Sequence, residues 1–529
     1  MAIIDPKTLA RASELKAWPE LLSHVDKGLD VHAYQIDSVL KVVEALDGRA
    51  ILADEVGLGK TIEAGLVAAE LKARRGVRNV LILVPAGLQT QWVEELFAKF
   101  GWVAQKGPKE RGWLWVLSID TAKRAPLLQQ LQYVEWDLVV VDEAHHLKNT
   151  HTQNYQLVMG LKCRYLLLLT ATPMENRLTE LYTLVNLVKP GLFGPYLRFY
   201  RQFILDRRTP KNAAELRGLL SQVMVRNQRH EVGLPFPGRD VTLVPLRLSR
   251  EERELYTGLS ASLKTEYRHR VRMDQTVLPL LILQRELCSS PQALLPTLEK
   301  SDWIGPNLGE LVSLARRVGV TEKMRAVREL ARHIKERMLI FTEYRGTQEA
   351  LVQFLREDGF EAAAFHGGLR TRDRDQLVEW FKEGARVLVS TEAGGQGINL
   401  QFCHVVVNFD LPWNPMRIEQ RIGRVHRIGQ VDSVQIYNLF AVETVEEDIL
   451  RLLHEKIDLF RTVIGELDVI LRHIERRGSL EKRLIDIFFW EDDHDSMVNR
   501  LEQLGNEFLA ARQRLSWPSP SPGEERDAR

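Results

Sequence analysis

The chain has 529 residues, of which 45% are hydrophobic and 27% are charged, and its formal net charge is +1. At ~150 residues per domain this length predicts roughly three structural units, and the composition is that of a folded globular protein. No stretch approaches the ~18 apolar residues of a membrane span, and no basic segment followed by an apolar core directs export. Disordered, fibrous and membrane classes are therefore excluded, and we expect a cytoplasmic monomer.

Short apolar runs alternate with helix-like segments in two separate parts of the chain. Each run is apolar on both faces and ends at a turn or a polar residue, as expected of buried parallel strands. Because strands that alternate with helices form crossover units on a parallel sheet, the pattern predicts two similar α/β lobes. The predicted strands cover residues 49–53, 79–84, 137–141 and 165–169 in the first set, and 338–341, 386–390, 405–409 and 434–439 in the second.

The segments outside these runs are mostly helix-like. A proline- and glycine-rich turn at 234–238 breaks the chain between the lobes, and apolar residues keep a helical spacing after residue 445. These features predict a division into an N-terminal flank (1–30), a first lobe (31–240) with a helical protrusion near 190–230, a helical connector (241–320), a second lobe (321–445), a C-terminal helical brace (446–515) and a disordered tail (516–529).

The segment Asp-Glu-Val-Gly-Leu-Gly-Lys-Thr, which ends at Thr61, lies between an apolar strand and a helix-like run. Backbone N–H groups at a helix N-terminus can cradle phosphates, while a lysine reaches the β and γ oxygens and a threonine hydroxyl helps to hold Mg²⁺. We therefore predict that Gly57, Gly59, Lys60 and Thr61 bind ATP. The general phosphate-loop pattern has glycine where this chain has Asp54, so a chance glycine-rich turn is the alternative.

Two adjacent carboxylates, Asp142 and Glu143, end a predicted buried strand further along the chain. Carboxylates at the carboxyl edge of a sheet can divide the work of hydrolysis, because one can hold Mg²⁺ while the next polarises the attacking water as general base. We predict the metal role for Asp142 and the base role for Glu143, against the alternative of a solvated strand end. The neighbouring His145 and His146 lack the further ligands of a zinc site, and we expect them to bridge the nucleotide and coupling segments.

Six motifs in this order and spacing resemble the superfamily-two helicase-like ATPases, specifically the SWI/SNF-type translocases and their bacterial branch around the RNA-polymerase-associated ATPase. The resemblance covers about residues 30 to 445, and the aspartate at the start of the phosphate loop matches this branch. The Gln-Phe-Cys segment at 401–403 departs from the family pattern. The resemblance is carried by residues 53–65, 83–85, 142–145, 169–173, 390–400 and 420–430.

The family likeness implies two RecA-like lobes, each a parallel sheet flanked by helices, with a helical insertion between them and a helical C-terminal extension. ATP would lie in the cleft between the lobes, and nucleic acid would cross their outer edge. By the same likeness, Gln35 matches the glutamine that reads the adenine, and Thr170 and Thr172 match the motif that couples the carboxylates to the second lobe. A helix-surface glutamine and a threonine-rich strand end are the alternatives.

The last motif contains Gln420, Arg424 and Arg427, which share one face if the segment is a helix. An arginine that enters a phosphoryl-transfer site stabilises the charge on the transferring group. We predict that Arg424 and Arg427 are the arginine fingers and that Gln420 contacts the nucleotide, against the alternative of a solvated basic helix. Since these residues and the phosphate loop come from different lobes, hydrolysis would require the lobes to close.

Nucleic-acid contacts are expected at the lobe surfaces, because tracking along a phosphate backbone needs amides, hydroxyls and cations. The family likeness places such contacts at residues 85–91 and 118–121, at Thr347, and at residues 391–395, which begin with Thr391. Trp413 lies in a proline-flanked turn, and we predict that its indole contacts DNA, with core packing as the alternative. The charge distribution slightly favours nucleic-acid binding, since residues 1–429 carry a net charge of +9 and residues 430–529 a net charge of −8.

The expected function is ATP-driven translocation on double-stranded DNA without strand separation, because one strand and a turn fill residues 397–420 and leave no room for a long wedge. A strand-separating DNA or RNA helicase, a motor subunit of a prokaryotic defence system and a binding module without hydrolysis are the alternatives. The expected partners are duplex DNA and a protein such as RNA polymerase or a defence-system subunit, and the expected cofactors are ATP and Mg²⁺.

Overall fold

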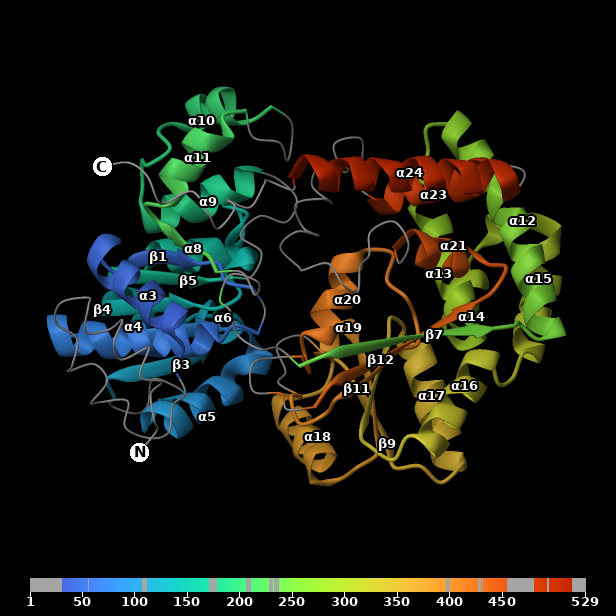
Figure 1. Cartoon of the computed structure of the whole chain (residues 1–529), viewed down its shortest axis with the longest axis horizontal. Coiled ribbons are helices and arrows are strands. Elements are labelled where there is room, and N and C mark those ends of the chain that lie inside the picture. Colours follow the sequence, from blue (N-terminus) through green and yellow to red (C-terminus); the bar gives the residue numbers. More distant parts are fainter. Residues whose placement is uncertain are drawn as a thin grey trace, which may run out of the picture.

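The computed structural model describes residues 31–55, 57–106, 112–170, 178–205, 211–227, 232, 237–395, 400–426, 430, 432–453, 480–491 and 494–515. These residues form two parallel six-stranded sheets, each flanked by helices, which confirms the predicted fold class of two RecA-like lobes (Figure 1). The first lobe, blue to green, lies on one side of Figure 1, and the second lobe, mainly orange, lies on the other. Thr172, Arg427 and the predicted flank and tail lie outside the described residues.

The sheet of the first lobe has the strand order β3-β2-β4-β5-β1-β6. Successive residues of its central strands point to opposite faces, so Ile51 joins one apolar cluster with the helices α8 to α10, while Leu52 joins another with α3 to α5. The strands are β1 (Arg49–Leu52), β2 (Val80–Val84), β3 (Leu114–Ser118), β4 (Glu135–Val141), β5 (Lys162–Leu169) and β6 (Met224–Val225). The helices are α3 (Ala33–Leu40), η1 (Lys41–Ala45), α4 (Lys60–Arg75), η2 (Ala86–Leu88), α5 (Gln89–Phe100), α6 (Ile119–Ala122), α7 (Leu127–Tyr133), η3 (Ala144–Leu147), α8 (Gln153–Gly160), α9 (Leu178–Val188), α10 (Tyr196–Phe203) and α11 (Ala213–Leu220).

The sheet of the second lobe has the order β7-β12-β11-β8-β10-β9, and all its printed pairings are parallel. Ile340 packs on one face with α16 and α17, whereas Leu339 packs on the other face with the connector helices. The strands are β7 (Arg239–Leu246), β8 (Met338–Thr342), β9 (Ala362–Phe365), β10 (Val387–Thr391), β11 (Val405–Asn408) and β12 (Val434–Ala441). The helices are α16 (Glu322–His333), α17 (Arg345–Glu357), α18 (Thr371–Glu383), α19 (Glu392–Gly395), α20 (Pro415–Ile422) and α21 (Val445–Arg451).

Every predicted strand is present, and the four strands that the sequence did not indicate, β3, β6, β7 and β9, are the edge strands of the two sheets. An edge strand pairs on one side only, so it does not need the continuous apolar run that marks a central strand. β7 alternates between half-buried and exposed residues and contains Pro245, which an edge position tolerates. Because β7 pairs with β12 along its whole length, the division between the lobes lies before Arg239 rather than at the predicted residue 240.

A helical layer covers one face of the second lobe. It combines the connector helices with the C-terminal helices in the same apolar cluster, and α12 packs against α23 (Figure 1). Gly305 interrupts the layer with a φ of 72°, where glycine avoids the clash of a β-carbon. The connector helices are α12 (Arg250–Arg272), α13 (Leu278–Ser289), α14 (Pro291–Leu298), η4 (Asp302–Asn307) and α15 (Leu308–Arg317), and the C-terminal helices are α23 (Leu480–Trp490) and α24 (His494–Leu515).

Within the described ranges, no helix has both the length and the apolar character needed to cross a bilayer.

Candidate nucleotide site between the lobes

The predicted phosphate loop lies between the end of β1 and the start of α4. Gly57 and Gly59 have φ angles of 88° and 85°, which a residue with a β-carbon adopts only with strain. A β-carbon on Gly59 would also lie 2.9 Å from Gln35 Nε2. Gly59 is the N-cap of α4 and no side chain caps this helix end, so its first N–H groups have the geometry that suits an anionic ligand.

Lys60 is the first residue of α4 and lies half-buried at the loop. Its Nζ donates hydrogen bonds to the carbonyl oxygens of Asp54 at 2.8 Å and Glu55 at 3.3 Å. Burial lowers the pKa of Lys60, and the nearby carboxylates, Glu143 first among them, oppose that shift. The ammonium group therefore lies between the loop carbonyls and the carboxylates that follow β4, where a phosphate could join it.

Gln35 lies behind the same loop with an exposed fraction of 1%. Its Nε2 donates to the carbonyl oxygen of Leu58 at 3.1 Å, and its Oε1 accepts from the backbone N–H of His32 at 3.1 Å. The hydroxyl of Tyr34 donates to the same Leu58 carbonyl. Helix α3 is thus bound directly to the phosphate loop, and the predicted adenine-reading residue stands beside it.

Asp142 follows β4, and two donors hold its carboxylate. Trp92 Nε1 donates to Oδ2 at 2.8 Å, and the backbone N–H of Glu143 donates to Oδ1 at 2.8 Å. Burial raises the pKa of Asp142 to about 6, with the neighbouring carboxylate of Glu143 as a further cause. Sequence reasoning missed Trp92, because no local pattern shows that a tryptophan fifty residues upstream holds this side chain.

Glu143 adopts a φ of 49°, which is uncommon for a residue with a side chain and often accompanies a functional site. Its Oε2 lies 3.2 Å from Nδ1 of His145. Burial would raise the pKa of Glu143, but the hydrogen bond and charge of His145, followed by the charges of Arg424 and Lys60, lower it to about 2. The carboxylate is therefore ionised near neutral pH, as a general base requires.

Asp54 has a different role from the phosphate-facing glycine of the general loop pattern. Its side chain is fully buried and accepts hydrogen bonds from the backbone N–H and the Nδ2 of Asn227, both at 2.9 Å. Asn227 Nδ2 also donates to Ser38 Oγ at 2.8 Å. The aspartate thus ties the loop to the segment that follows β6, which explains physically why this position departs from the general pattern.

The predicted arginine motif lies at the end of α20 in the second lobe. The prediction that Gln420 and Arg424 share one helical face is wrong, because α20 ends at Ile422, and Arg427 lies outside the described residues. Gln420 is half-buried within the helix, while Arg424 lies in the turn after it and donates its backbone N–H to the Arg421 carbonyl at 3.1 Å. Arg424 is still close enough to lower the pKa of Glu143 in the other lobe.

Thr170 is fully buried directly after β5, and its backbone N–H donates to the Leu52 carbonyl at 3.0 Å. This hydrogen bond joins the end of β5, the neighbour of β4, to β1, which leads into the phosphate loop. Its predicted coupling partner Thr172 cannot be placed, because it lies outside the described residues.

The geometry does not support the predicted DNA contacts of Thr347, Thr391 and Trp413. Thr347 is fully buried and Thr391 is 6% exposed. The indole of Trp413 is 4% exposed and packs edge-on against Phe488 of α23, with ring centroids 5.7 Å apart. The alternative interpretation, core packing, describes Trp413 in this structure, because the C-terminal helices cover the turn that sequence reasoning left at the surface.

The donor set fits Mg²⁺ better than a metal held by protein ligands alone. In the part of the chain that the structure describes, no three His, Cys, Asp or Glu side chains form a metal-binding group. Mg²⁺ is typically held by one or two carboxylates together with phosphate oxygens and water. Thr61 at the start of α4 and Asp142 after β4 have the hydroxyl and carboxylate oxygens that such a site uses.

A phosphate loop and a carboxylate pair in one RecA-like lobe, faced by an arginine from a second lobe, define a two-lobed ATPase of the helicase type. Family models agree with this class: the SNF2-related domain matches residues 116–293, the helicase conserved C-terminal domain matches 322–429, and the type III restriction enzyme res subunit matches 28–175. The chain belongs to the SNF2-related family of ATP-dependent helicases, and it is an ATP hydrolase of helicase superfamily two.

Similar proteins extend this result over most of the chain. A Bacillus subtilis (strain 168) protein, "Uncharacterized ATP-dependent helicase YqhH", is 42% identical over 91% of this chain and 88% of its own length. The RNA polymerase-associated protein RapA of Klebsiella pneumoniae (strain 342) is 30% identical over 86% of this chain, which spans only 53% of that relative. The solved Hef helicase domain of Pyrococcus furiosus has the same fold, with a TM-score of 0.50 and 18% identity, over 79% of this chain and 96% of that one.

Proposed function

We propose that this ATPase is a translocase on double-stranded DNA that remodels or displaces DNA-bound protein complexes without separating the strands. The observation that carries the motor action is the position of Arg424, whose charge acts on Glu143 across the boundary between the lobes. An arginine supplied by one lobe can stabilise the transferring phosphoryl group only while the lobes are close together. Each round of hydrolysis would therefore change the distance between two nucleic-acid-binding lobes.

The residues of the site have distinct roles in this proposal. Lys60 and the N–H groups at the start of α4 bind and orient the phosphates, while Glu143 takes a proton from the attacking water. Asp142 and Thr61 would hold Mg²⁺, which supplies positive charge to the phosphate oxygens when it is bound. Trp92 and His145 orient the two carboxylates.

The absence of a wedge supports movement along an intact duplex. Between residues 400 and 426 the described chain contains only β11 and α20 as regular elements, joined by the turn that packs Trp413 into the core. A hairpin long enough to split base pairs does not occur in that stretch. Strand separation remains the competing function, and it would need a separating element elsewhere.

The DNA track in this proposal follows the carboxyl edges of the sheets. Residues 85–91 and 118–121 follow the neighbouring strands β2 and β3, so backbone amides and hydroxyls gather there. On the second lobe, the side chains of Arg345 and Arg370 are 62% and 90% exposed. Exposed cations and amides of this kind suit phosphate contacts that do not depend on base sequence.

The protein partner and the cellular location are separate proposals. Association with RNA polymerase is suggested only by the name of the RapA relatives, of which this chain spans about half. A defence-system subunit is the other partner class. A cytoplasmic location and a monomeric state remain predictions from the sequence.

The test compares nucleic acids as activators of ATP hydrolysis. Duplex DNA should stimulate hydrolysis more than single-stranded DNA or RNA, the stimulation should fall as salt rises, and a third strand or a bound protein should be displaced from an intact duplex. Unwinding of a forked duplex, or stronger stimulation by RNA, would replace the translocase proposal with the strand-separating helicase.

A further inference from the structure

Helix α20, which leads into Arg424, is held by a group of charged side chains, largely buried except for Arg417, that we call the Glu343 cluster: Arg285, Glu343, Asp410, Arg417 and Arg421. Glu343 follows β8 and forms an ion pair with Arg285 of the connector helix α13. Its Oε1 also lies 3.9 Å from Nη1 of Arg417 and 3.9 Å from Nη2 of Arg421, both on α20. One carboxylate thus stands between the connector and the helix that precedes the catalytic arginine.

Asp410 makes a second connection between the same elements. Its Oδ2 accepts hydrogen bonds from Ser289 Oγ at 3.0 Å, Thr342 Oγ1 at 2.6 Å and the backbone N–H of Glu343 at 2.9 Å. Arg421 Nη1 in turn donates to the backbone carbonyl of Asp410 at 2.7 Å. The end of α13, the end of β8 and the C-terminal end of α20 therefore meet at one loop.

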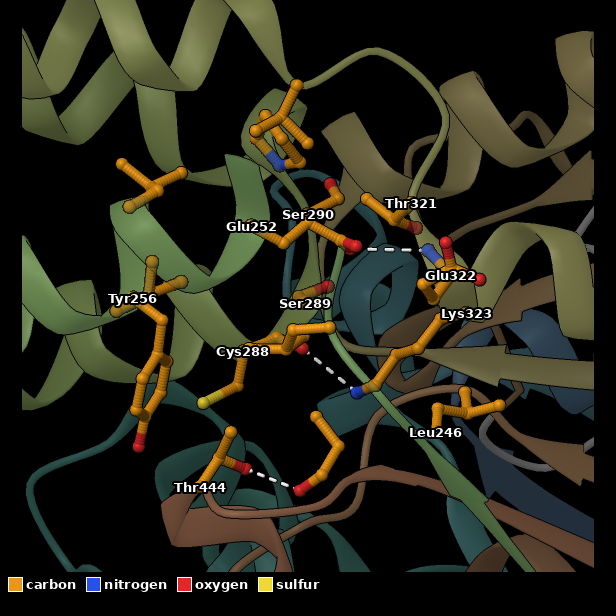
Figure 2. A pocket seen from close by; sticks show the side chains of 16 residues that line it. Leu246, Glu252, Tyr256, Cys288, Ser289, Ser290, Thr321, Glu322, Lys323 and Thr444 are labelled. Carbon is orange, nitrogen blue, oxygen red and sulfur yellow. Dashed lines mark hydrogen bonds between the residues drawn. The ribbon is translucent and has the colours of Figure 1, made fainter. Parts of the chain in front are cut away.

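The connector is itself fixed to the second lobe at this point. Figure 2 shows Lys323 of α16 reaching the carbonyl oxygen of Cys288 at the end of α13, at 2.9 Å. Lys323 Nζ also donates to Glu446 Oε1 at 2.5 Å and lies 4.0 Å from Asp410 Oδ1. These polar contacts add to the apolar packing of the connector helices against the second lobe, and Cys288 and Lys323 line the cavity drawn in Figure 2.

Two central members of the cluster, Arg421 and Glu343, are buried, as expected of charged side chains that hold helix α20 in place. Arg421 is 2% exposed and Glu343 is 9% exposed by side chain, and burial of this kind is costly unless charges are paired. Glu343 Oε1 and Arg421 Nη2 have no hydrogen-bond partner among the described residues, although they lie 3.9 Å apart. A small displacement of α20 would bring them to hydrogen-bonding distance, so the energy of the cluster depends on where the helix lies.

The position of α20 in turn sets the position of Arg424. The backbone N–H of Gly423 donates to the Glu419 carbonyl at 2.8 Å, and that of Arg424 donates to the Arg421 carbonyl at 3.1 Å. Only a single turn of chain separates the buried guanidinium of Arg421 from Arg424. A rotation or shift of α20 is therefore transmitted to the arginine that faces Glu143.

We propose that Arg285 and Glu343 are positioning residues, which hold α20 so that Arg424 reaches the nucleotide and thereby couple the helical connector to ATP hydrolysis. This inference rests on the proposed role of Arg424. It assigns to the connector a part in the chemical step, although the connector contributes no residue to the site.

The experiment uses the full chain and measures kcat and KM for ATP with saturating duplex DNA, the affinity for a fluorescent ATP analogue, and the melting temperature. The variants are Arg285→Met and Glu343→Gln, each in the wild-type background and in Arg424→Ala. Arg250→Met is the matched control, since Arg250 forms an exposed ion pair with Glu254 on the connector helix α12.

Arg285→Met should lower kcat by about tenfold while KM and analogue affinity change by less than about twofold, because only the transition-state contact is displaced. In the Arg424→Ala background the same substitution should change kcat by less than about twofold, since the residue through which it acts is already gone. Arg250→Met should leave all four quantities unchanged. If either cluster variant melts early, the neutral pair Arg285→Met with Glu343→Gln, which leaves no unpaired charge between these two residues, is measured in the same way.

An unchanged kcat in folded Arg285→Met and Glu343→Gln would overturn the inference and leave the role of Arg424 intact. An equal loss of kcat in both backgrounds would also overturn it, because Arg285 would then act independently of Arg424. Full activity in Arg424→Ala itself would remove the arginine finger from the proposed function, and the inference with it. Preferential stimulation by RNA would change the proposed substrate but not this result.

Discussion

In the first lobe, Lys60 at the start of α4 and Glu143 after β4 are half-buried and lie close to each other. In the second lobe, the loops that follow β8 and β11 carry Glu343 and Asp410, which are buried and face inward onto connector and lobe residues. The two sheets have the same strand number and direction, so the same structural edge serves two purposes. Arg424 of the second lobe acts on Glu143 of the site, whereas Glu343 and Asp410 hold elements of their own lobe and the connector in place.

This difference indicates how the work is divided between the lobes. A half-buried carboxylate next to a lysine can contact a nucleotide and water, whereas the buried Asp410 already accepts hydrogen bonds from three protein donors. Substitutions in the first lobe should therefore alter binding and chemistry without unfolding the protein. Substitutions in the second lobe should alter either the stability or the position of Arg424.

The largest expected effect tests the chemistry of the first lobe. Glu143→Gln should reduce kcat by roughly 10²- to 10⁴-fold while ATP affinity is kept, because the amide preserves the shape but cannot accept the proton. Glu135→Gln, at the exposed start of the same strand, is the control. Turnover and nucleotide affinity measured side by side give the answer, and wild-type turnover in Glu143→Gln would show that another group activates the water.

The next effect tests whether Trp413, in the turn before α20, packs in the hydrophobic core. Trp413→Ala should destabilise the protein by about 3–5 kcal/mol and lower the melting temperature by several degrees, because the indole packs against Phe488. Trp490→Ala, at an exposed tryptophan of α23, should change melting far less. A Trp413→Ala protein that keeps its melting temperature and basal activity but loses DNA stimulation would return this residue to the DNA-binding surface.

Lys60→Ala tests whether ATP binding and ATP hydrolysis depend on different residues of the first lobe. Removal of the ammonium group should weaken ATP binding by roughly 10- to 150-fold, the range for a lost hydrogen bond to a charged group. Lys72→Ala, on the exposed side of the same helix, is the control. Titration with a fluorescent ATP analogue measures the change, and unaltered affinity would mean that the loop amides bind the phosphates without this lysine.

The smallest effect concerns the connector and depends on pH. Burial raises the pKa of Glu286 to about 7, and a hydrogen bond from Thr297 only partly opposes that shift. The carboxyl therefore contributes stability below its unfolded pKa, near pH 4.5, and this contribution is lost as the pH rises through about 7. Glu286→Gln should raise the melting temperature at pH 8 and change it little at pH 5.

Melting curves of wild-type and Glu286→Gln protein at both pH values provide the measurement, with the surface substitution Glu299→Gln as the control. An equal shift at the two pH values would show that the carboxyl titrates normally in the folded protein. A variant that is less stable than wild type at pH 8 would contradict the expected sign.

Local motifs allowed much of the site to be predicted. The phosphate loop and the carboxylate pair are contiguous segments, and each carries its chemistry in the types and order of its own residues. Their supporting residues were not predictable in this way. Trp92 holds Asp142 from fifty positions away, and Asn227 holds Asp54 from 173 positions away, so only folding brings these donors to their acceptors.

The predicted helical face of Gln420 and Arg424 illustrates a second limit. A spacing of four residues places two side chains on one face only if the helix continues, and here α20 ends at Ile422, before Arg424. Edge strands such as β7 and β9 were missed for a related reason. The sequence of β7 lacks the continuous apolar run of a strand with neighbours on both sides, and the apolar run of β9 is only four residues long, three of them alanine.

Apolar runs and contiguous motifs encode the two-lobed class, the central strands and the residue types of the phosphate loop locally, so these features could be predicted from the sequence. The tertiary structure decided which side chains are available to a partner. It buries Trp413 under α23, places Thr347 against the hydroxyls of Ser289 and Ser290, and joins the connector to α20 through Glu343. Burial and long-range pairing depend on which surfaces pack together, and that is a property of the whole fold rather than of any one segment.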